Sequence, residues 1–431
     1  MFSFPDAKNV FVEIANSASE KFGHIKDRTL KIIGVLGSAF TLKEILPEDE
    51  KTRIYPMENK GDGIFEAKGI QASENTPYRF IVVKDDTTVN VVKDPYTKQQ
   101  PDINGWSEVY DPDNYKWVNT DWLTGKDSRR ITRKPNEPFR GLENLIIEEI
   151  NIPTVTKEGT FESAKKYIDK IAEKGIATAI EIMPVENTYS PQWGYDGVDK
   201  MAVNEKLGGP VQLKSLIDYA HGKGLNVIMD MVPNHIGPDG DSLTKAGPYE
   251  SGAGEFGGEL NYEGIDNRYV RDWMTNAALW WANEFKVDGI RFDMTKHCKS
   301  DYFLKQIVAE VNEHNPDVFL IAEDGRENFD KVTQYNRFEM THDNELAMID
   351  QGVDNIAQRR FNSDPGEIGF DSEWDFPFMH DIKDALLTPS PILLGKLDWK
   401  IKNSAYRVKY TMSHDEIGNE DGTRFIPKVI T

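Results

Sequence analysis

The stretch GIRFDMTKH, residues 289–297, places an arginine and an aspartate two positions apart. Residues i and i+2 of a β-strand point to the same face, so Arg291 and Asp293 would lie side by side in a strand. The guanidinium would lower the pKa of Asp293 and keep its carboxylate ionised, which suits a nucleophile or an electrostatic stabiliser. An ordinary ion pair at a strand end is the simpler explanation of this stretch alone, so other segments must decide between the two.

Three other apolar runs also end in residues that carry charge or transfer protons. They are NVIMDMVPNH, which ends in Asp230, Asn234 and His235, DVFLIAE, which ends in Glu323, and YRVKYTMSHDE, which ends in His414, Asp415 and Glu416. The apolar residues before Glu323 would desolvate its carboxyl and raise its pKa, so that it would serve as a proton donor. Glycoside hydrolysis needs two such carboxyls, one as acid and the other as nucleophile or base.

The elements that must position these groups alternate between strand and helix after about residue 141. Short apolar runs alternate with helical stretches such as FESAKKYIDKIAEKG and VQLKSLIDYAHGKG, which predicts an α/β fold with a parallel sheet or a TIM-type (β/α)8 barrel. In such a barrel the active site lies at the C-terminal ends of the strands, so the polar groups would converge on one mouth. We expect seven strands, which begin near Leu145, Ala177, Asn226, Val287, Val318, Glu367 and Tyr406.

An eighth barrel strand is not expected. Too few residues follow Asp415 to form a further strand and helix. We therefore expect a gap between the first and the seventh strand, and unpaired strand edges at such a gap would favour association.

The chain before the barrel predicts a second structural unit. Short alternating runs such as YRFIVVK and VNVVKDP predict an Ig-like β-sandwich over residues 1–110. Residues 111–140 contain turn residues and aromatics without periodicity, which indicates an ordered linker. The barrel then spans residues 141–431, and its long glycine-rich loop 236–265 is expected to be a substrate-facing lid or a small subdomain.

Composition limits the class of partner and the cellular location. The formal net charge of −21 argues against nucleic acid and anionic membranes as partners and favours a neutral substrate. Neither a signal peptide nor an apolar run of about 20 residues is evident, so we expect a cytoplasmic protein. The only cysteine, Cys298, excludes an intrachain disulfide and a cysteine-rich metal site, and we expect it to be a bystander.

In this order along the chain, the strand-end segments resemble the four sequence regions of the α-amylase superfamily of glycoside hydrolases. The resemblance implies that Asp293 is the nucleophile, Glu323 the general acid/base and Asp415 the carboxylate that stabilises the transition state. It also implies that Arg291 supports these groups. The remaining positions that the resemblance singles out are the sugar-contacting His235 and His414, the stacking Tyr195, and Asp230 and Asn234 as structural support.

Two positions leave alternatives open. Trp193 in SPQWGYDGV fits a core residue and a sugar platform equally well. Asn234 matches a calcium ligand of many amylases, but the loop after it lacks the clustered carboxylates that calcium prefers, so we expect no metal and no cofactor.

The segments EEINIPTVTKEGTF and IEIMPVENTYSPQWGYDGV resemble maltooligosyltrehalose trehalohydrolases and glycogen branching enzymes. This resemblance implies a carbohydrate-binding type of N-terminal unit and an α-1,4-glucan as substrate. Hydrolysis of a maltooligosyl-trehalose is the preferred activity, because IAEDGREN and SHDEIGN look closer to the trehalohydrolases. A branching enzyme, an α-amylase and a non-catalytic glucan-binding protein remain the alternatives.

Overall fold

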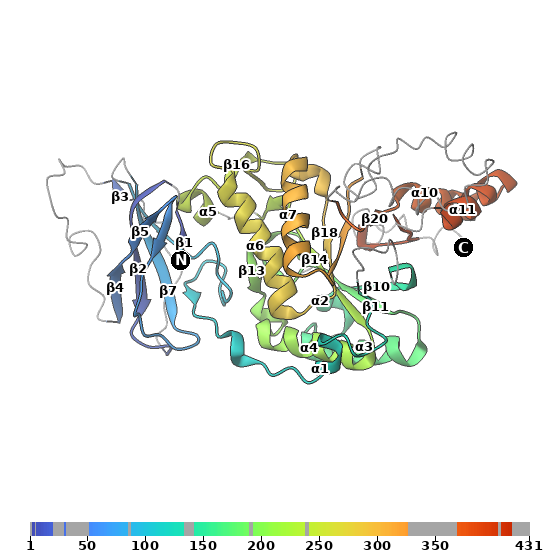
Figure 1. The fold of residues 1–431 in the computed structure, drawn as a ribbon, viewed down its shortest axis with the longest axis horizontal. Helices are drawn as coiled ribbons and strands as arrows, with labels where there is room; N and C mark the ends of the chain where they lie inside the picture. Colours follow the sequence, from blue (N-terminus) through green and yellow to red (C-terminus); the bar gives the residue numbers. More distant parts are fainter. Residues whose placement is uncertain are drawn as a thin grey trace.

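The described part of the chain forms an N-terminal β unit and a larger α/β unit, which lie side by side (Figure 1). A connecting segment runs from the β unit along the edge of the α/β unit, close to α3 and α4. The structure is a computed structural model. It describes residues 2–4, 6–19, 30–31, 51–84, 88–132, 142–188, 193–237, 241–325, 369–403 and 407–415.

The N-terminal unit consists of two antiparallel sheets. The first has the order β3-β8-β7-β2-β4, with β9 paired to β7, and the second has the order β1-β6-β5. Edge-to-face packing of Phe4 on Phe80, with ring centroids 5.1 Å apart, joins the two sheets. The strands are β1 (Phe2–Ser3), β2 (Ala7–Ala15), β3 (Leu30–Lys31), β4 (Thr52–Pro56), β5 (Glu58–Gly61), β6 (Ile64–Glu66), β7 (Pro77–Lys84), β8 (Thr88–Val92) and β9 (Ser107–Glu108).

The sequence analysis missed β2, although this strand pairs with both β7 and β4 in the larger sheet. Val10, Val12 and Ile14 alternate along one face of β2, and the buried Glu13 lies on the opposite face. Arg79 of the neighbouring strand donates to the Glu13 carboxylate at 2.7 Å, and the Thr52 hydroxyl donates to it at 2.9 Å. A buried charge with such partners is tolerated in a sheet.

The connecting segment is ordered by aromatic and ionic contacts with the base of the α/β unit. It contains η2 (Pro112–Asn114) and α1 (Thr120–Leu123). The indole of the buried Trp122 donates to Asp288 at 3.0 Å, and Arg130 donates to the same carboxyl oxygen at 3.1 Å. His221 contacts the other oxygen of Asp288 at 3.0 Å. Residues 133–141 lie outside the described residues, so the expected end of the linker stays a prediction.

The α/β unit is built on a curled parallel sheet of seven strands in the order β10-β11-β14-β18-β19-β20-β21. This confirms the predicted α/β barrel class, and the described residues contain the seven expected strands; the absence of an eighth strand stays a prediction, because residues 416–431 lie outside the described residues. The expected starts near Glu367 and Tyr406 lie outside the described residues. Within the described part of the sheet, β10 and β21 are the two ends and do not pair with each other. The strands are β10 (Ile147–Ile150), β11 (Ala179–Ile182), β14 (Asn226–Met231), β18 (Gly289–Phe292), β19 (Phe319–Ala322), β20 (Ser372–Trp374) and β21 (Arg407–Val408).

Helices follow the strands and cover the outer face of the sheet (Figure 1). The first long helix begins with a capping box of Thr160 and Ser163 and ends at Gly175, which adopts the left-handed conformation that favours glycine. None of the described helices has the length and apolar content to cross a membrane. The helices are η3 (Leu142–Asn144), α2 (Ile152–Val155), α3 (Phe161–Lys174), η4 (Glu205–Leu207), α4 (Gly209–Lys223), α6 (Arg268–Phe285), η5 (Thr295–Cys298), α7 (Asp301–His314), α10 (Phe376–Leu387) and α11 (Pro391–Asn403).

The interior of the curled sheet is apolar in its lower layer and polar in its upper layer. Ala179, Ile228 and Phe319 belong to one buried cluster inside the sheet. Two residues further along each strand, alternation returns the side chains to the same face. Asp230 of β14 and Arg291 of β18 occupy this upper layer and are register partners. The strands therefore carry charged groups at their C-terminal ends, as the sequence predicted.

Two small β elements flank the strand ends. After β11, β12 (Glu186–Thr188) pairs with β13 (Gly197–Val203). The loop segment 236–265 contributes a three-stranded sheet of the order β15-β17-β16 together with α5, so it is a small subdomain in the described residues. Its elements are β15 (His235–Ile236), α5 (Asp241–Ala246), β16 (Glu250–Ala253) and β17 (Gly258–Leu260).

A substitution of Gly289, at the start of β18, can test the packing of the barrel interior. A Cβ atom at this position would overlap the ring of Phe319 on the neighbouring strand. We expect Gly289→Ala to reduce the free energy of unfolding by roughly 1–3 kcal/mol, because overpacking forces the neighbouring side chain from its place. Urea unfolding followed by circular dichroism measures the change.

The matched control is Gly395→Ala in the middle of α11, where a Cβ atom would meet no other atom within 4 Å. This variant should be as stable as the parent or slightly more stable, because alanine favours the helix by about 0.5–1 kcal/mol over glycine. Equal unfolding midpoints for Gly289→Ala and the parent would contradict the described packing.

Candidate active site

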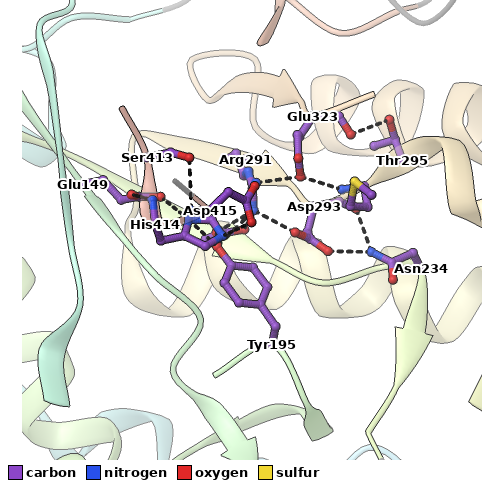
Figure 2. Close-up of polar contacts among 12 residues, drawn as sticks. Glu149, Tyr195, Asn234, Arg291, Asp293, Thr295, Glu323, Ser413, His414 and Asp415 are labelled. Atoms are coloured by element: carbon purple, nitrogen blue, oxygen red, sulfur yellow. Dashed lines mark hydrogen bonds and ion pairs between the residues drawn. The ribbon is translucent and has the colours of Figure 1, made fainter. Parts of the chain in front are cut away.

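The guanidinium of Arg291 lies at the centre of the site, fully buried at the end of β18 (Figure 2). Its Nη1 donates to Asp230 at 2.6 Å and to Asp293 Oδ1 at 3.1 Å. Its Nη2 donates to Glu323 Oε2 at 2.7 Å. One cation therefore holds three carboxyl groups from three neighbouring strands.

Asp293 has a second partner on the side away from Arg291. The amide of Asn234 donates to Asp293 Oδ2 at 2.6 Å and to the Asp293 carbonyl at 2.9 Å. The other end of the Asn234 amide contacts the ring of His235. Both oxygens of the Asp293 carboxyl are thus fixed by donors, and the amide orients Asp293. In the described residues, no group of three His, Cys, Asp or Glu side chains is arranged to hold a metal ion.

Glu323 differs from Asp293 in its surroundings. Burial raises the pKa of Glu323 to about 8, and the charge of Asp293 raises it too, while Arg291 opposes the shift. The backbone N–H of Met294 also donates to Glu323 Oε2, at 3.0 Å. Met294 adopts a left-handed conformation with φ 40°, which is strained for a non-glycine residue. Glu323 is therefore protonated at neutral pH and can donate a proton.

Two aromatic residues flank the site on the β12–β13 side. The ring of Tyr195 stacks on His414 with centroids 4.7 Å apart, and its hydroxyl donates to Asp230 at 2.6 Å. The ring centroids of Trp193 and His414 lie 5.9 Å apart. Between them, Gly194 has φ 87°, and a Cβ atom there would overlap the Pro184 carbonyl. Only glycine fits this close approach, so the turn directs both aromatic side chains toward the strand ends.

His414 connects the segment after β21 to the first strand. Its Nδ1 lies 2.7 Å from Glu149 Oε1, and its backbone N–H donates to Glu149 Oε2 at 2.8 Å (Figure 2). Although burial favours the neutral ring, the contact with Glu149 raises the pKa of His414 to about 9. Because folding raises this pKa, the ion pair stabilises the fold at low and neutral pH and loses this effect as the pH rises through about 9.

The carboxyl groups open into a cavity of about 530 Å³. All three expected catalytic carboxyls, the three expected sugar contacts and Trp193 line it, whereas Arg291, Asp230 and Asn234 lie buried beneath it. Asp415 is the most exposed of the three carboxyls, with 37% of its side chain accessible. The cavity is lined by Trp193, Tyr195, His235, Phe256, Asp293, Met294, Lys296, Glu323, Gly325, Phe376, His380, His414 and Asp415.

Sequence reasoning missed several groups of the site. Phe256 of the small subdomain lines the cavity, and Trp374 of β20 places its ring 4.4 Å from the Arg291 guanidinium carbon. Glu149 and Glu181 are register partners whose side chains share the interior of the sheet with Arg291. Carboxylates within the runs NLIIEEI and AIEIM were the available signal for the last two.

Comparison with known proteins identifies the class of this fold and site. Residues 148–252 match the sequence model of the α-amylase catalytic domain. This match and the relatives below confirm the resemblance to the α-amylase superfamily that the strand-end segments indicate.

Two curated relatives and one solved structure specify the resemblance. The chain is 35% identical over 276 residues to the malto-oligosyltrehalose trehalohydrolase of Saccharolobus solfataricus, covering 63% of this chain and 45% of the relative. It is 26% identical over 370 residues to the 1,4-alpha-glucan branching enzyme of Prochlorococcus marinus, and the match covers 77% of this chain and 47% of the relative. A pullulanase from Anoxybacillus sp. LM18-11, solved with maltotriose, has the same fold, with a TM-score of 0.65 at 16% identity over 96% of this chain and 58% of the pullulanase. The chain spans about half the length of the curated relatives it matches.

The raised pKa of Glu323 predicts a basic limb in the pH dependence of activity. If protonated Glu323 donates to the leaving group, kcat/KM should fall about tenfold per pH unit above about 8, because the group then loses its proton. Initial rates of glucan cleavage between pH 5 and 10 measure this limb.

Glu313→Gln on the surface of α7 is the control for removal of a carboxyl. It should leave the limb in place, whereas Glu323→Gln should remove most of the activity at every pH. A rate that stays constant up to pH 10 would show that Glu323 is not the acid.

Proposed function

We propose that this chain acts on α-1,4-glucans by a retaining mechanism. Asp293 attacks the anomeric carbon while protonated Glu323 donates its proton to the glycosidic oxygen. A covalent glycosyl-enzyme intermediate forms on Asp293. Glu323, now ionised, then takes a proton from water or from a sugar hydroxyl, whose oxygen displaces Asp293.

One observation supports this proposal above all. Asp293 and Glu323 both contact the guanidinium of Arg291, although the surroundings of the two carboxyls differ. Arg291 Nη1 reaches Asp293 at 3.1 Å and Nη2 reaches Glu323 at 2.7 Å, so both carboxyls face the same cavity. Retaining enzymes hold their two carboxyl groups about 5–5.5 Å apart, and two carboxyls on adjacent nitrogens of one guanidinium suit that requirement. Asp415 at the rim of the cavity is the third carboxyl, and its negative charge would stabilise an oxocarbenium-like transition state.

For the substrate, we propose hydrolysis of a maltooligosyl-trehalose next to its trehalose end. The relative that supports this choice is the trehalohydrolase, at 35% identity. A branching enzyme is the second candidate, since the relative of that name covers 77% of the chain. Both reactions pass through the same intermediate and differ in the acceptor, which is water or a glucan hydroxyl. The C-terminal parts of the segments IAEDGREN and SHDEIGN, which favoured the first choice, lie outside the described residues. An α-glucan as partner and a cytoplasmic location belong to the same proposal.

The experiment that tests the function incubates the chain with maltooligosaccharides, a maltooligosyl-trehalose and amylose, and identifies the products and their anomeric form. Release of free trehalose supports the trehalohydrolase. New 1,6 linkages without trehalose release support the branching enzyme instead. Linear maltooligosaccharides as the main products would indicate an α-amylase. Binding of the glucan without any product would favour the non-catalytic alternative.

Asp293→Asn tests the nucleophile. The amide is a poor nucleophile at the same position, so we expect turnover to fall roughly 10³-fold or more, while glucan binding stays within a few-fold of the parent. Product analysis and isothermal titration calorimetry measure the two quantities.

The matched control is Asp272→Asn, the same change at an exposed position of α6, which should leave both turnover and binding unaltered. Parent-like turnover in the Asp293→Asn protein would refute the proposed intermediate.

A further inference from the structure

Glu149 is a half-buried carboxylate at the site, to which the proposed mechanism gives no task. It lies in β10, and its side chain meets the ring and the backbone of His414 in the segment that follows β21. The two contacts, at 2.7 Å and 2.8 Å, use both carboxyl oxygens. A bidentate carboxylate fixes the position and the orientation of its partner more strongly than one contact does.

The geometry assigns different tasks to the two nitrogens of the His414 ring. Nδ1 faces Glu149, so in the cation its proton is directed to that carboxylate. Nε2 lies on the side of Asp415, 3.6 Å from Oδ1, and both residues line the cavity. The partner of one ring nitrogen determines what the other nitrogen presents to a ligand. In the cation, where Nδ1 donates its proton to Glu149, Nε2 also carries a proton and presents an N–H donor at the cavity wall.

Glu149 also joins two strands that do not pair. In the described sheet, β10 and β21 are the two ends of the strand order, and the Glu149–His414 contact connects the C-terminal end of one to the segment after the other. That segment carries Asp415, the next residue along the chain. A displacement of His414 would therefore move one of the three cavity carboxyls as well.

We propose that Glu149 is a positioning residue of this site, which holds His414 as a cation with its Nε2 proton directed at the ligand and fastens the Asp415 segment to β10. This goes beyond the proposed function, and it rests on that function only for the activity measurement described below. The ionisable groups that face His414 are Glu149 of β10, Glu181 of β11, Tyr195 before β13, Arg291 of β18 and the neighbouring Asp415. Of these, Glu149 alone contacts Nδ1 as a carboxylate.

The direct test is a titration of His414 in the full chain labelled with 13Cε1-histidine. His414→Gln assigns its signal among the eight histidines. In the parent, the signal should titrate near pH 9. In Glu149→Gln, the proton affinity of the ring should fall at least tenfold, because burial still disfavours the cation while the carboxylate is gone. Glu149→Asp keeps the charge on a shorter side chain and should give an intermediate midpoint.

The chain provides a matched control one residue away. Glu148 lies on the same strand but points to the outer face, where it accepts a hydrogen bond from Tyr167 of α3 at 2.7 Å. Glu148→Gln removes an equal charge from the same strand and should leave the His414 midpoint unchanged. An unchanged midpoint in folded Glu149→Gln would overturn the proposal. If that variant does not fold, a parent midpoint at or below 6.5 would overturn it equally.

Activity supplies a second, separable measurement. In Glu149→Gln, KM for the glucan should rise as the pH exceeds the new His414 midpoint, and Glu149→Asp should restore part of the affinity. A merely structural loss would reduce affinity equally at every pH. If the parent cleaves no glucan but the midpoint falls in Glu149→Gln, the positioning role stands and the proposed function fails. If the parent cleaves glucan but the His414 midpoint does not shift in Glu149→Gln, the proposed function stands and the positioning role of Glu149 fails.

Discussion

The fold and the site both depend on the burial of one guanidinium, that of Arg291. Its side chain is inaccessible to solvent and contacts Asp230, Asp293 and Glu323. A charge so deep in a protein is stable only when carboxylates and donors surround it, and removal of one member of a buried pair costs about 3–5 kcal/mol. The end of β18, its two neighbouring strands and the Tyr195 turn are therefore constrained to meet at this cation. The geometry of the site is a product of the same constraint that brings these strand ends together.

Around this cation, nearly identical carboxyl groups acquire different properties. Burial and the nearby Asp293 charge keep a proton on Glu323. Burial likewise raises the pKa of Glu181 to about 8, whereas its register neighbour Glu149 has a lowered pKa, because the contact with His414 outweighs burial. The number of acidic residues in the site says little about its charge. The balance between burial and the neighbouring charges decides the protonation of each group: burial outweighs the contact of Glu323 with Arg291, whereas at Glu149 the contact with His414 outweighs burial.

The sequence was sufficient to predict what depends on local pattern. Buried strands that end in Asp293, Glu323 and His414 predicted both the parallel barrel and the mouth where these groups meet. The sequence was not sufficient where a residue's role depends on which face it occupies. Glu148 and Glu149 are adjacent, yet one contacts α3 and the other His414, and only the register of β10 decides between them. The burial of Glu13 could not be predicted for a related reason, since its partners come from distant segments.

The polar contacts at Asp288 affect how the α/β unit can be separated from the rest of the chain. This buried carboxylate, at the N-terminal end of β18, receives Trp122 and Arg130 of the connecting segment and His221 of α4. A fragment that starts at the first barrel strand would keep His221 but would deprive the other oxygen of this buried carboxylate of both its donors, Trp122 and Arg130. By these contacts, the connecting segment is a structural part of the barrel and not of the β unit. The place to cut the chain for an isolated catalytic unit is before Trp122, within the sequence that follows β9.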